Sequence, residues 1–298
     1  MRRVLRVLGA LVLAPQLTGC DDEHADVELI QKTRVLTARV EVVGEPSRAS
    51  PLPGESVNVR FLVVAPEPEP ELAFSLASCV AIDSASSLAE CAGEPFARAS
   101  SLEPLPALPS IEFDAPAELS GKEWLAVQGV VCPAGGALEA AAGDACSNGR
   151  GQAVSVDFPM DDGSAPNTNP SILNVSFDGL ELPADTGTSD DCSALPQIKA
   201  GSKDHPLHVE LDPSSRDPLP VVESSDADRE SLLVSYFITH GLVDHAWGSI
   251  PSTAANTSTT TNWDAPGTRE PLLARFILVA RDGRGGSDFT ERRVCVVP

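Results

Sequence analysis

Short apolar runs, separated by frequent prolines and glycines, limit what this chain can fold into. The 298 residues include 26 prolines and 22 glycines, which break helices and mark turns. Between these breaks, apolar and polar residues alternate, and the segment 56–64 would place Val57, Val59, Phe61 and Val63 on one face of a strand. A period of two is typical of strands that bury one face. The pattern therefore predicts an all-β fold of the sandwich type.

The same pattern locates the expected strands and loops. We expect strands at 35–43, 56–64, 72–79, 124–132 and 153–158, within 169–179, and at 206–211, 232–239, 272–281 and 293–297. The proline-rich residues 65–71 should form a loop, and residues 101–118 a loop or an edge strand. The Ser/Thr-rich residues 252–262 are expected to be a surface loop, and residues 282–286 a tight turn whose glycines supply positive φ. A helix is credible only at 137–142, and there for no more than a turn or two.

A polar segment near the middle of the chain, residues 161–170, is the expected boundary between two domains. It is rich in Asp, Asn and Pro, and a chain of this length suits two domains of ordinary size. We therefore expect a first β-sandwich domain at 33–160 and a second at 171–298. The acidic residues 20–32 are expected to form a tether in front of the first domain.

The N-terminus has the layout of an export signal. Three arginines in the first six residues precede a compact apolar stretch, 7–14, which is too short to span a membrane. The residues from Leu17 to Cys20, Leu-Thr-Gly-Cys, resemble the lipobox of bacterial lipoproteins. The resemblance implies that residues 1–19 are removed as a signal peptide and that Cys20 carries the lipid that holds the chain in the membrane.

The residues after Cys20 bear on which membrane holds the chain. Asp21 and Asp22 resemble the inner-membrane retention signal of enteric bacteria, a rule that other bacterial groups do not follow. The excess of arginine over lysine and the many alanines are similar to those of lipoproteins from GC-rich predatory or social bacteria. We expect a lipid-anchored protein of the cell envelope, with the outer membrane favoured over the inner, facing either the periplasm or the cell surface.

Lipidation of Cys20 leaves six of the seven cysteines, and an even number in an exported chain favours disulfides. No C-x-x-C pair is present, which argues against a zinc ribbon or a thioredoxin-like redox site. The polar segment 161–170 separates the first four of these cysteines from the last two. We therefore expect Cys192 to pair with Cys295, near the two ends of the second domain.

Two pairings remain open for the four cysteines of the first domain. We favour the local pairs Cys79–Cys91 and Cys132–Cys146, because each encloses a short stretch rich in Ala, Gly and Ser that could not order itself by burial. The alternative is a Cys79–Cys132 bridge between sheets, as in immunoglobulin domains.

The formal net charge of −22 excludes one class of partner. Such a field repels phosphate backbones and anionic lipid headgroups, so we expect no nucleic acid partner and no attachment through a basic patch. The membrane is expected to be contacted through the lipid alone. Aromatic residues make up only 4% of the chain, so its cores must depend on Val, Leu, Ala and Ile.

Three segments of the second half resemble bacterial PKD-like or cadherin-like domains of the immunoglobulin type. They are Asn-Pro-x-Ile at 169–172, the acidic run 225–230 before Leu-Leu-Val-Ser-Tyr, and Val-Ala-Arg-Asp-Gly-Arg-Gly-Gly at 279–286. The resemblance covers residues 168–298. Together with the pattern of the first half, it implies two tandem immunoglobulin-like β-sandwich domains after a cleaved signal peptide.

The acidic run offers the favoured candidate metal site. Asp226, Asp228 and Glu230 alternate along it, and calcium binds six to eight oxygens of the kind that such a run supplies. An EF-hand is excluded, because the glycine of the sharp turn and the closing acidic residue are missing. Calcium is therefore the cofactor that the sequence favours, and a solvated acidic turn is the alternative. His240, Asp244 and His245 lie close together in one expected loop and offer a second, less favoured metal site, for zinc or copper.

Catalytic signatures are absent from the sequence. It contains no G-x-S-x-G, H-E-x-x-H or P-loop motif. His205 and His208 would lie on opposite faces of a strand, which is poor geometry for a shared metal. Trp124, beside an apolar strand, is expected to fill the core, whereas Trp247 and Trp263 flank the Ser/Thr-rich loop and offer a candidate carbohydrate platform. We therefore expect that the protein is not an enzyme.

These observations favour a non-catalytic, lipid-anchored envelope protein that acts as a binding, adhesion or interaction module. Its partner, an unknown protein or carbohydrate, would be met through loops of the second domain. The alternatives are a periplasmic structural or assembly lipoprotein without a ligand of its own and, third, an enzyme.

Overall fold

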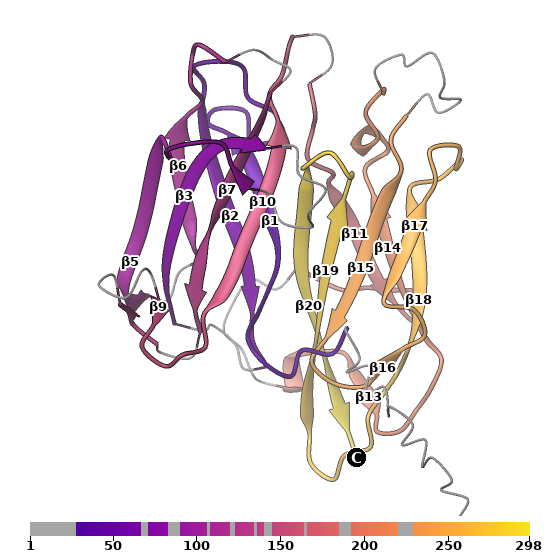
Figure 1. The fold of residues 1–298 in the computed structure, drawn as a ribbon. Coiled ribbons are helices and arrows are strands. Elements are labelled where there is room, and N and C mark those ends of the chain that lie inside the picture. The colour runs from indigo at the N-terminus through magenta and orange to yellow at the C-terminus, as the bar shows by residue number, and fades with distance from the viewer. Residues whose placement is uncertain are drawn as a thin grey trace, which may run out of the picture.

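The fold is all-β, as the alternating pattern predicts. The computed structural model describes residues 28–66, 71–82, 90–105, 108–119, 123–133, 136–139, 145–163, 166–184, 192–219 and 229–298. These residues form strands and short 3-10 helices, and no α-helix occurs among them. The strands build two sandwiches that stand side by side, one from each half of the chain (Figure 1).

The first sandwich pairs a three-stranded sheet with a five-stranded one. The smaller sheet has the order β1 (Arg34–Val42), β2 (Ser56–Val64), β6 (Ser110–Asp114). The larger has the order β10 (Gln152–Pro159), β7 (Trp124–Cys132), β3 (Leu72–Ile82), with β4 (Glu90–Cys91) and β5 (Ala97–Leu105) both paired to β3. A small hairpin joins β8 (Leu138–Glu139) to β9 (Ala145–Cys146).

The second sandwich pairs two five-stranded sheets. One has the order β12 (Leu180–Glu181), β11 (Ile172–Phe177), β14 (His205–Leu211), β18 (Ser258–Asp264), β16 (Leu242–Val243). The other has the order β13 (Gln197–Lys199), β20 (Ser287–Val297), β19 (Leu272–Arg281), β15 (Leu232–Ile238), β17 (Trp247–Ile250). The 3-10 helices are η2 (Cys192–Ala194) and η3 (Pro213–Ser215).

The two sandwiches repeat one strand order. The sheet β1-β2-β6 corresponds to β11-β14-β18, and β10-β7-β3-β5 corresponds to β20-β19-β15-β17. Pairing is antiparallel except for β13, which runs parallel to β20. This repeated arrangement is compatible with immunoglobulin-like domains.

Each sandwich has its own apolar core, drawn from the alternating faces of its strands. In the first, Val57, Val59 and Phe61 are buried on one face of β2, as the alternation predicts. In the second, Trp263 is fully buried and lies edge-on to Phe276, with ring centroids 5.2 Å apart. The two cores are separate clusters of contacts.

A third apolar cluster joins the two sandwiches. Its buried members are Ile30, Leu62, Val64, Ile277 and Val279. Leu62 and Val64 of β2 and Ile277 and Val279 of β19 point away from the cores of their own sandwiches. Each of these strands is therefore buried on both faces where it meets the other sandwich. This explains why the alternation gives way to unbroken apolar runs at 61–64 and 276–280.

Residues 28–30 do not belong to a free tether. The Ile30 N–H donates to the Ile238 carbonyl at 2.7 Å, and the Ile238 N–H donates to the Glu28 carbonyl at 2.9 Å. Ile30 is buried in the cluster between the sandwiches. Residues 28–30 of the expected tether 20–32 are therefore part of the fold, because Ile30 finds a surface to bury against.

Two local expectations are wrong. Residues 258–262 of the expected Ser/Thr-rich loop are part of β18, which pairs with both β14 and β16. Threonine is β-branched and favours strands, and this preference outweighs the polar composition. Within the expected helix at 137–142, Leu138 and Glu139 form β8, and the remainder after Glu139 lies outside the described residues.

Three disulfides hold the sandwiches together internally, and they are the three pairs favoured above. Cys79 bonds Cys91, joining β3 to β4, and Cys132 bonds Cys146, joining β7 to β9. The pair Cys192–Cys295 spans 103 residues and ties η2 to the last strand of the second sandwich. Cys20 lies outside the described residues.

Candidate binding groove at the junction of the sandwiches

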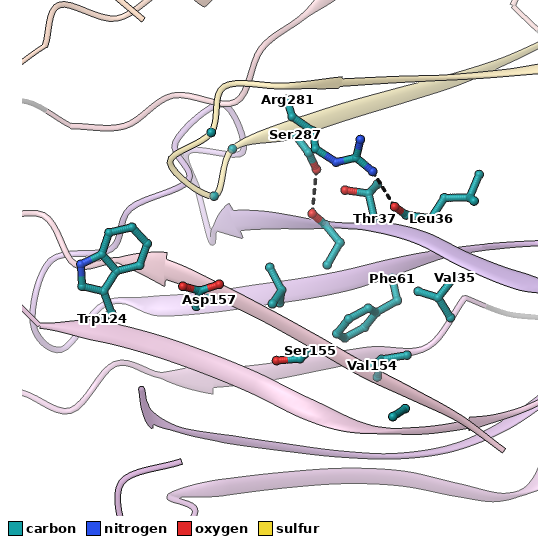
Figure 2. Close-up of a pocket in the computed structure, with 16 residues that line it drawn as sticks. Val35, Leu36, Thr37, Phe61, Trp124, Val154, Ser155, Asp157, Arg281 and Ser287 are labelled. Carbon is teal, nitrogen blue, oxygen red and sulfur yellow. Dashed lines mark hydrogen bonds between the residues drawn. The ribbon is translucent and has the colours of Figure 1, made fainter. Parts of the chain in front are cut away.

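A groove of about 520 Å³ opens where the two sandwiches meet. Its walls are residues 35–38 of β1 and 153–157 of β10, which are the facing edge strands of the first sandwich. Phe61 and Val154, both buried, form an apolar floor. Figure 2 shows that Trp124 lies at one end of the groove and the β19–β20 turn of the second sandwich along its side.

The second sandwich covers the free edge of β1. Three carbonyls on this edge accept hydrogen bonds from side chains further along the chain: Leu36 from Arg281 Nη2 at 2.5 Å, Ala38 from Ser287 Oγ at 2.7 Å, and Val40 from Asn169 Nδ2 at 2.6 Å. Figure 2 shows the first two of these bonds beside the groove. An exposed strand edge is a template for pairing with another chain, and these side chains remove that template from β1. The β1 wall of the groove is therefore held in place by the second sandwich.

Arg281 supplies a cation to the lining that has no carboxylate partner among the described residues. Its Nη1 donates to Ser235 Oγ at 3.1 Å, and its Nη2 to the Leu36 carbonyl, both of which are neutral acceptors. Burial lowers the pKa of the guanidinium. Because a desolvated charge is stabilised by an opposite charge, this lining favours a ligand with an anionic group.

The turn between β19 and β20, residues 282–286, depends on its glycines. Gly283 and Gly285 have φ of 80° and 101°, as the sequence predicts for this turn. A Cβ on Gly285 would lie 2.8 Å from the Cβ of Phe158 in β10. Glycine therefore lets the second sandwich approach the first closely enough to close one side of the groove.

The polar segment 161–170 forms part of this junction. Asn167 and Asn169 are buried in it. Asn167 Nδ2 donates to Asp282 Oδ2 at 2.9 Å, and the Ser287 N–H donates to Asn169 Oδ1 at 2.9 Å. The asparagines that marked this segment as a polar spacer thus bond it to the second sandwich.

Three buried carboxylates, those of Asp217, Glu230 and Asp282, lie near the same turn. Glu230 Oε1 accepts a hydrogen bond from Arg284 Nη1 at 2.6 Å. Burial and the negative charge of Asp282 nevertheless raise the pKa of Glu230 to about 7. Burial also raises the pKa of Asp282. The junction therefore holds more negative charge than Arg284 alone neutralises.

The calcium expectation rests largely on residues outside this description. Asp226 and Asp228 lie outside the described residues, and Glu230 is bound to Arg284. Within the described part of the chain, no group of three or more His, Cys, Asp or Glu could hold a metal ion. Calcium at Asp226, Asp228 and Glu230 stays a prediction.

Raising the pH should weaken the junction through Glu230. Its ordinary pKa is 4.5 and its folded pKa is about 7. Between these values the folded protein keeps a proton that the unfolded chain has lost, so stability falls as pH rises through this window. We expect the free energy of unfolding to drop by about 1 to 3 kcal/mol from pH 5 to pH 8, measured by urea denaturation.

The control is Glu230→Gln, which keeps the shape and removes the titration. The free energy of unfolding of wild type minus that of Glu230→Gln should fall with pH in this way, because the other titrating groups contribute equally to both proteins. If this difference is constant, or rises with pH, Glu230 is not the source of the pH dependence. The measurements are made with a chelator present, and a rise in stability on adding calcium instead would be the signature of the expected calcium site.

The tryptophans are distributed differently from the expectation. Trp124 is 41% exposed at the rim of the groove, so the prediction that it fills the core is wrong. It begins β7, and the alternation places its neighbour Leu125 in the core instead. Trp263 is buried against Phe177 and cannot form a carbohydrate platform, whereas Trp247 is 61% exposed.

The two strand histidines have different partners, as opposite faces require. His208 contacts the Thr260 hydroxyl at 2.9 Å. His205 lies between Asp178 and Ser202, a grouping that no sequence motif marks because Asp178 comes from the separate β11–β12 turn. Arg281 was also missed, since an arginine at the end of an apolar strand looks like an ordinary surface charge.

Comparisons with known proteins assign neither a family nor a function to this chain. No protein-family model matches the chain, and no curated protein matches it. Similar solved structures include a red sea bream transglutaminase, with 13% identity and a TM-score of 0.26 over 89% of this chain and 32% of that one. An E. coli alpha-2-macroglobulin has 11% identity and a TM-score of 0.24 over 88% of this chain and 16% of that one. Dimeric latent PorU from Porphyromonas gingivalis has 11% identity and a TM-score of 0.22 over 88% of this chain and 24% of that one. The chain spans about a third or less of each, and at these scores the likeness carries no argument about function.

The fold and the disulfides together define the class of protein. The chain is an all-β protein of two immunoglobulin-compatible sandwiches. Its three disulfides indicate an oxidising, extracytoplasmic compartment. In the described ranges no helix is long and apolar enough to cross a membrane.

Proposed function

We propose that the protein is a binding module held in the cell envelope, at the outer membrane, by a lipid on Cys20. The oxidising compartment and the lipobox-like residues 17–20 support this address. The groove at the junction is the observation that carries the binding role. It combines an apolar floor, a half-exposed Trp124 and the partly buried cation Arg281, which is the usual make-up of a ligand site.

The ligand that fits this groove best is an extended peptide segment with a free carboxylate. Within the described residues, β10 pairs with β7 alone, so its other edge can receive an extended chain. Arg281 directs two of its five N–H donors to partners among the described residues, and a guanidinium matches a carboxylate. The net charge of −22 attracts basic chains over long range, so the rest of the segment should be neutral or basic.

Replacing Trp124 with alanine should weaken peptide binding at least about tenfold, because a large aromatic side chain at the rim supplies much of the contact area. The probe is a random peptide library with free C-terminal carboxylates, selected on the full chain. Affinities of the enriched peptides are then measured by calorimetry on wild type and Trp124→Ala.

Two controls make the result specific. Trp247→Ala removes a more exposed tryptophan from β17 of the second sandwich, outside the groove lining, and should bind as wild type does. The same peptides with amidated C-termini should bind more weakly than the free acids. The proposal fails if no peptide is enriched, if both tryptophan variants bind alike, or if amidation has no effect.

A further inference from the structure

Three side chains at one end of the second sandwich form a relay of hydrogen bonds. Ser202 Oγ lies 2.7 Å from His205 Nε2, and His205 Nδ1 lies 2.8 Å from Asp178 Oδ2. This end of β11 and β14 is remote from the groove. The opposite end of the two strands is the one that meets β20, where the Ile172 N–H donates to Asp288. The relay therefore has no part in the groove.

Each member is placed by its own local structure. Asp178 and Gly179, with φ of 50° and 77°, form the two-residue turn of the β11–β12 hairpin, for which Asp-Gly is the typical sequence. The Asp178 N–H donates to the Pro206 carbonyl at 3.0 Å, which fixes the turn against β14. Ser202 lies in the turn between β13 and β14, and His205 is the first residue of β14.

The ring of His205 is held in one orientation by aromatic neighbours. It stacks on Phe177, with ring centroids 5.4 Å apart and planes 19° from parallel, and Trp263 lies 6.1 Å away. The imidazole is only 16% exposed, while the Asp178 side chain is 38% exposed. A ring packed in this way presents a fixed nitrogen to Ser202.

The hydrogen-bond partners assign the tautomer. An ionised carboxylate can only accept, so Nδ1 of His205 carries the hydrogen that Asp178 receives. In the neutral ring Nε2 is then an acceptor that faces the Ser202 hydroxyl. That hydroxyl also lies 2.6 Å from the Lys199 carbonyl, so its hydrogen is shared between two acceptors. Other charges nearby are Lys203 and Asp264, which pair with each other at 3.1 Å.

We propose that Ser202 is a nucleophile, that His205 is its general base, and that Asp178 positions the imidazole, forming an acyl-transfer site for small esters. The arrangement has the roles and distances of a Ser-His-Asp triad, which recurs on unrelated folds. It lies on the surface near Lys203, which is open to solvent. Small, activated esters are therefore the substrates that can reach it.

The reaction is a hydrolysis in two steps, and water is the second substrate. The Ser202 oxygen attacks the ester carbonyl, its proton passes to His205 Nε2, and the same proton leaves with the departing alcohol as the carbon–oxygen bond to it breaks. Water, deprotonated by His205, then attacks the acyl group on Ser202. This releases the carboxylic acid and restores the serine hydroxyl.

A fluorophosphonate probe tests the nucleophile directly. The probe phosphorus bonds to the serine oxygen and fluoride leaves, so the modified residue is identified by mass spectrometry of the wild-type chain. We expect the label at Ser202, with no label there in Ser202→Ala. In His205→Ala the labelling rate should fall about 100-fold, since general-base catalysis contributes about that much or more.

His208→Ala is the matched control, because His208 lies on the same strand and contacts only a threonine hydroxyl in the described structure. It should label as wild type does. Hydrolysis of p-nitrophenyl acetate should follow the same order across the variants. If wild type takes no label at Ser202, or labels independently of His205, the three residues are a structural tie and the proposal is overturned.

The positioning role of Asp178 needs a separate readout. Asp178→Asn can accept through its amide oxygen but no longer stabilises the charged ring, so labelling should fall at least tenfold. Asp178→Glu, which keeps the carboxylate, should restore part of the rate. A full rate in Asp178→Asn, or no rescue by Asp178→Glu, would remove Asp178 from the mechanism.

Discussion

Replacing Cys192 and Cys295 together with alanine should lower the free energy of unfolding of the second sandwich by about 4 to 5 kcal/mol. The bond closes a loop of 103 residues, and the chain-entropy model gives about 4.7 kcal/mol for such a closure. Cys295 is also fully buried in β20, so its loss removes packing as well. The bond ties η2, which comes just before β13, to β20, the strand with which β13 pairs. The strand β13 itself has only three residues. We therefore expect β13 to open first.

The matched control is the double alanine variant of Cys79 and Cys91. That bond closes only 12 residues, for which the same model gives about 2.8 kcal/mol. Urea denaturation of both variants, with hydrogen exchange to locate the weakened strands, measures the difference. Equal losses in the two variants, or exchange confined to the first sandwich after removal of Cys192 and Cys295, would contradict the prediction.

Replacing Cys20 with serine should release the protein from the membrane almost completely. The proposed anchor depends on the thiol, because a thioether carries the lipid, and two or more acyl chains hold a protein stably where one does not. Metabolic labelling with an alkyne fatty acid and partition into detergent measure the attachment. Wild type should take up label and follow the detergent, whereas Cys20→Ser should take up none and remain in the aqueous phase.

Asp21→Asn is the matched control, since it changes the neighbouring residue and keeps the thiol. It should stay in the detergent phase. If Cys20→Ser also remains with the membrane, the anchor lies elsewhere and the proposed address is wrong. Binding by the groove would still be testable in that case, because it depends on none of these residues.

The periodicity of the sequence predicted the strands well where one face is buried. Residues 56–64 form β2 with the expected face inward, and residues 282–286 form the expected glycine turn. The periodicity failed at residues 258–262, where serine and threonine suggested a loop although their branched or small side chains fit an interior strand of a sheet. It also failed at residues 28–30, because two apolar residues in an acidic stretch carry no period.

Composition, alternation and cysteine number thus determined the all-β class and the favoured disulfide pairs, since these depend on local geometry and on counting. Only the tertiary structure decided the site. Trp124 and Arg281 line one groove because one sandwich packs against the other, and this packing is not encoded in the period of either strand. The relay of Asp178, Ser202 and His205 likewise arises because the β11–β12 turn meets the start of β14 in space, and no spacing along the chain marks Asp178 as a neighbour of the other two.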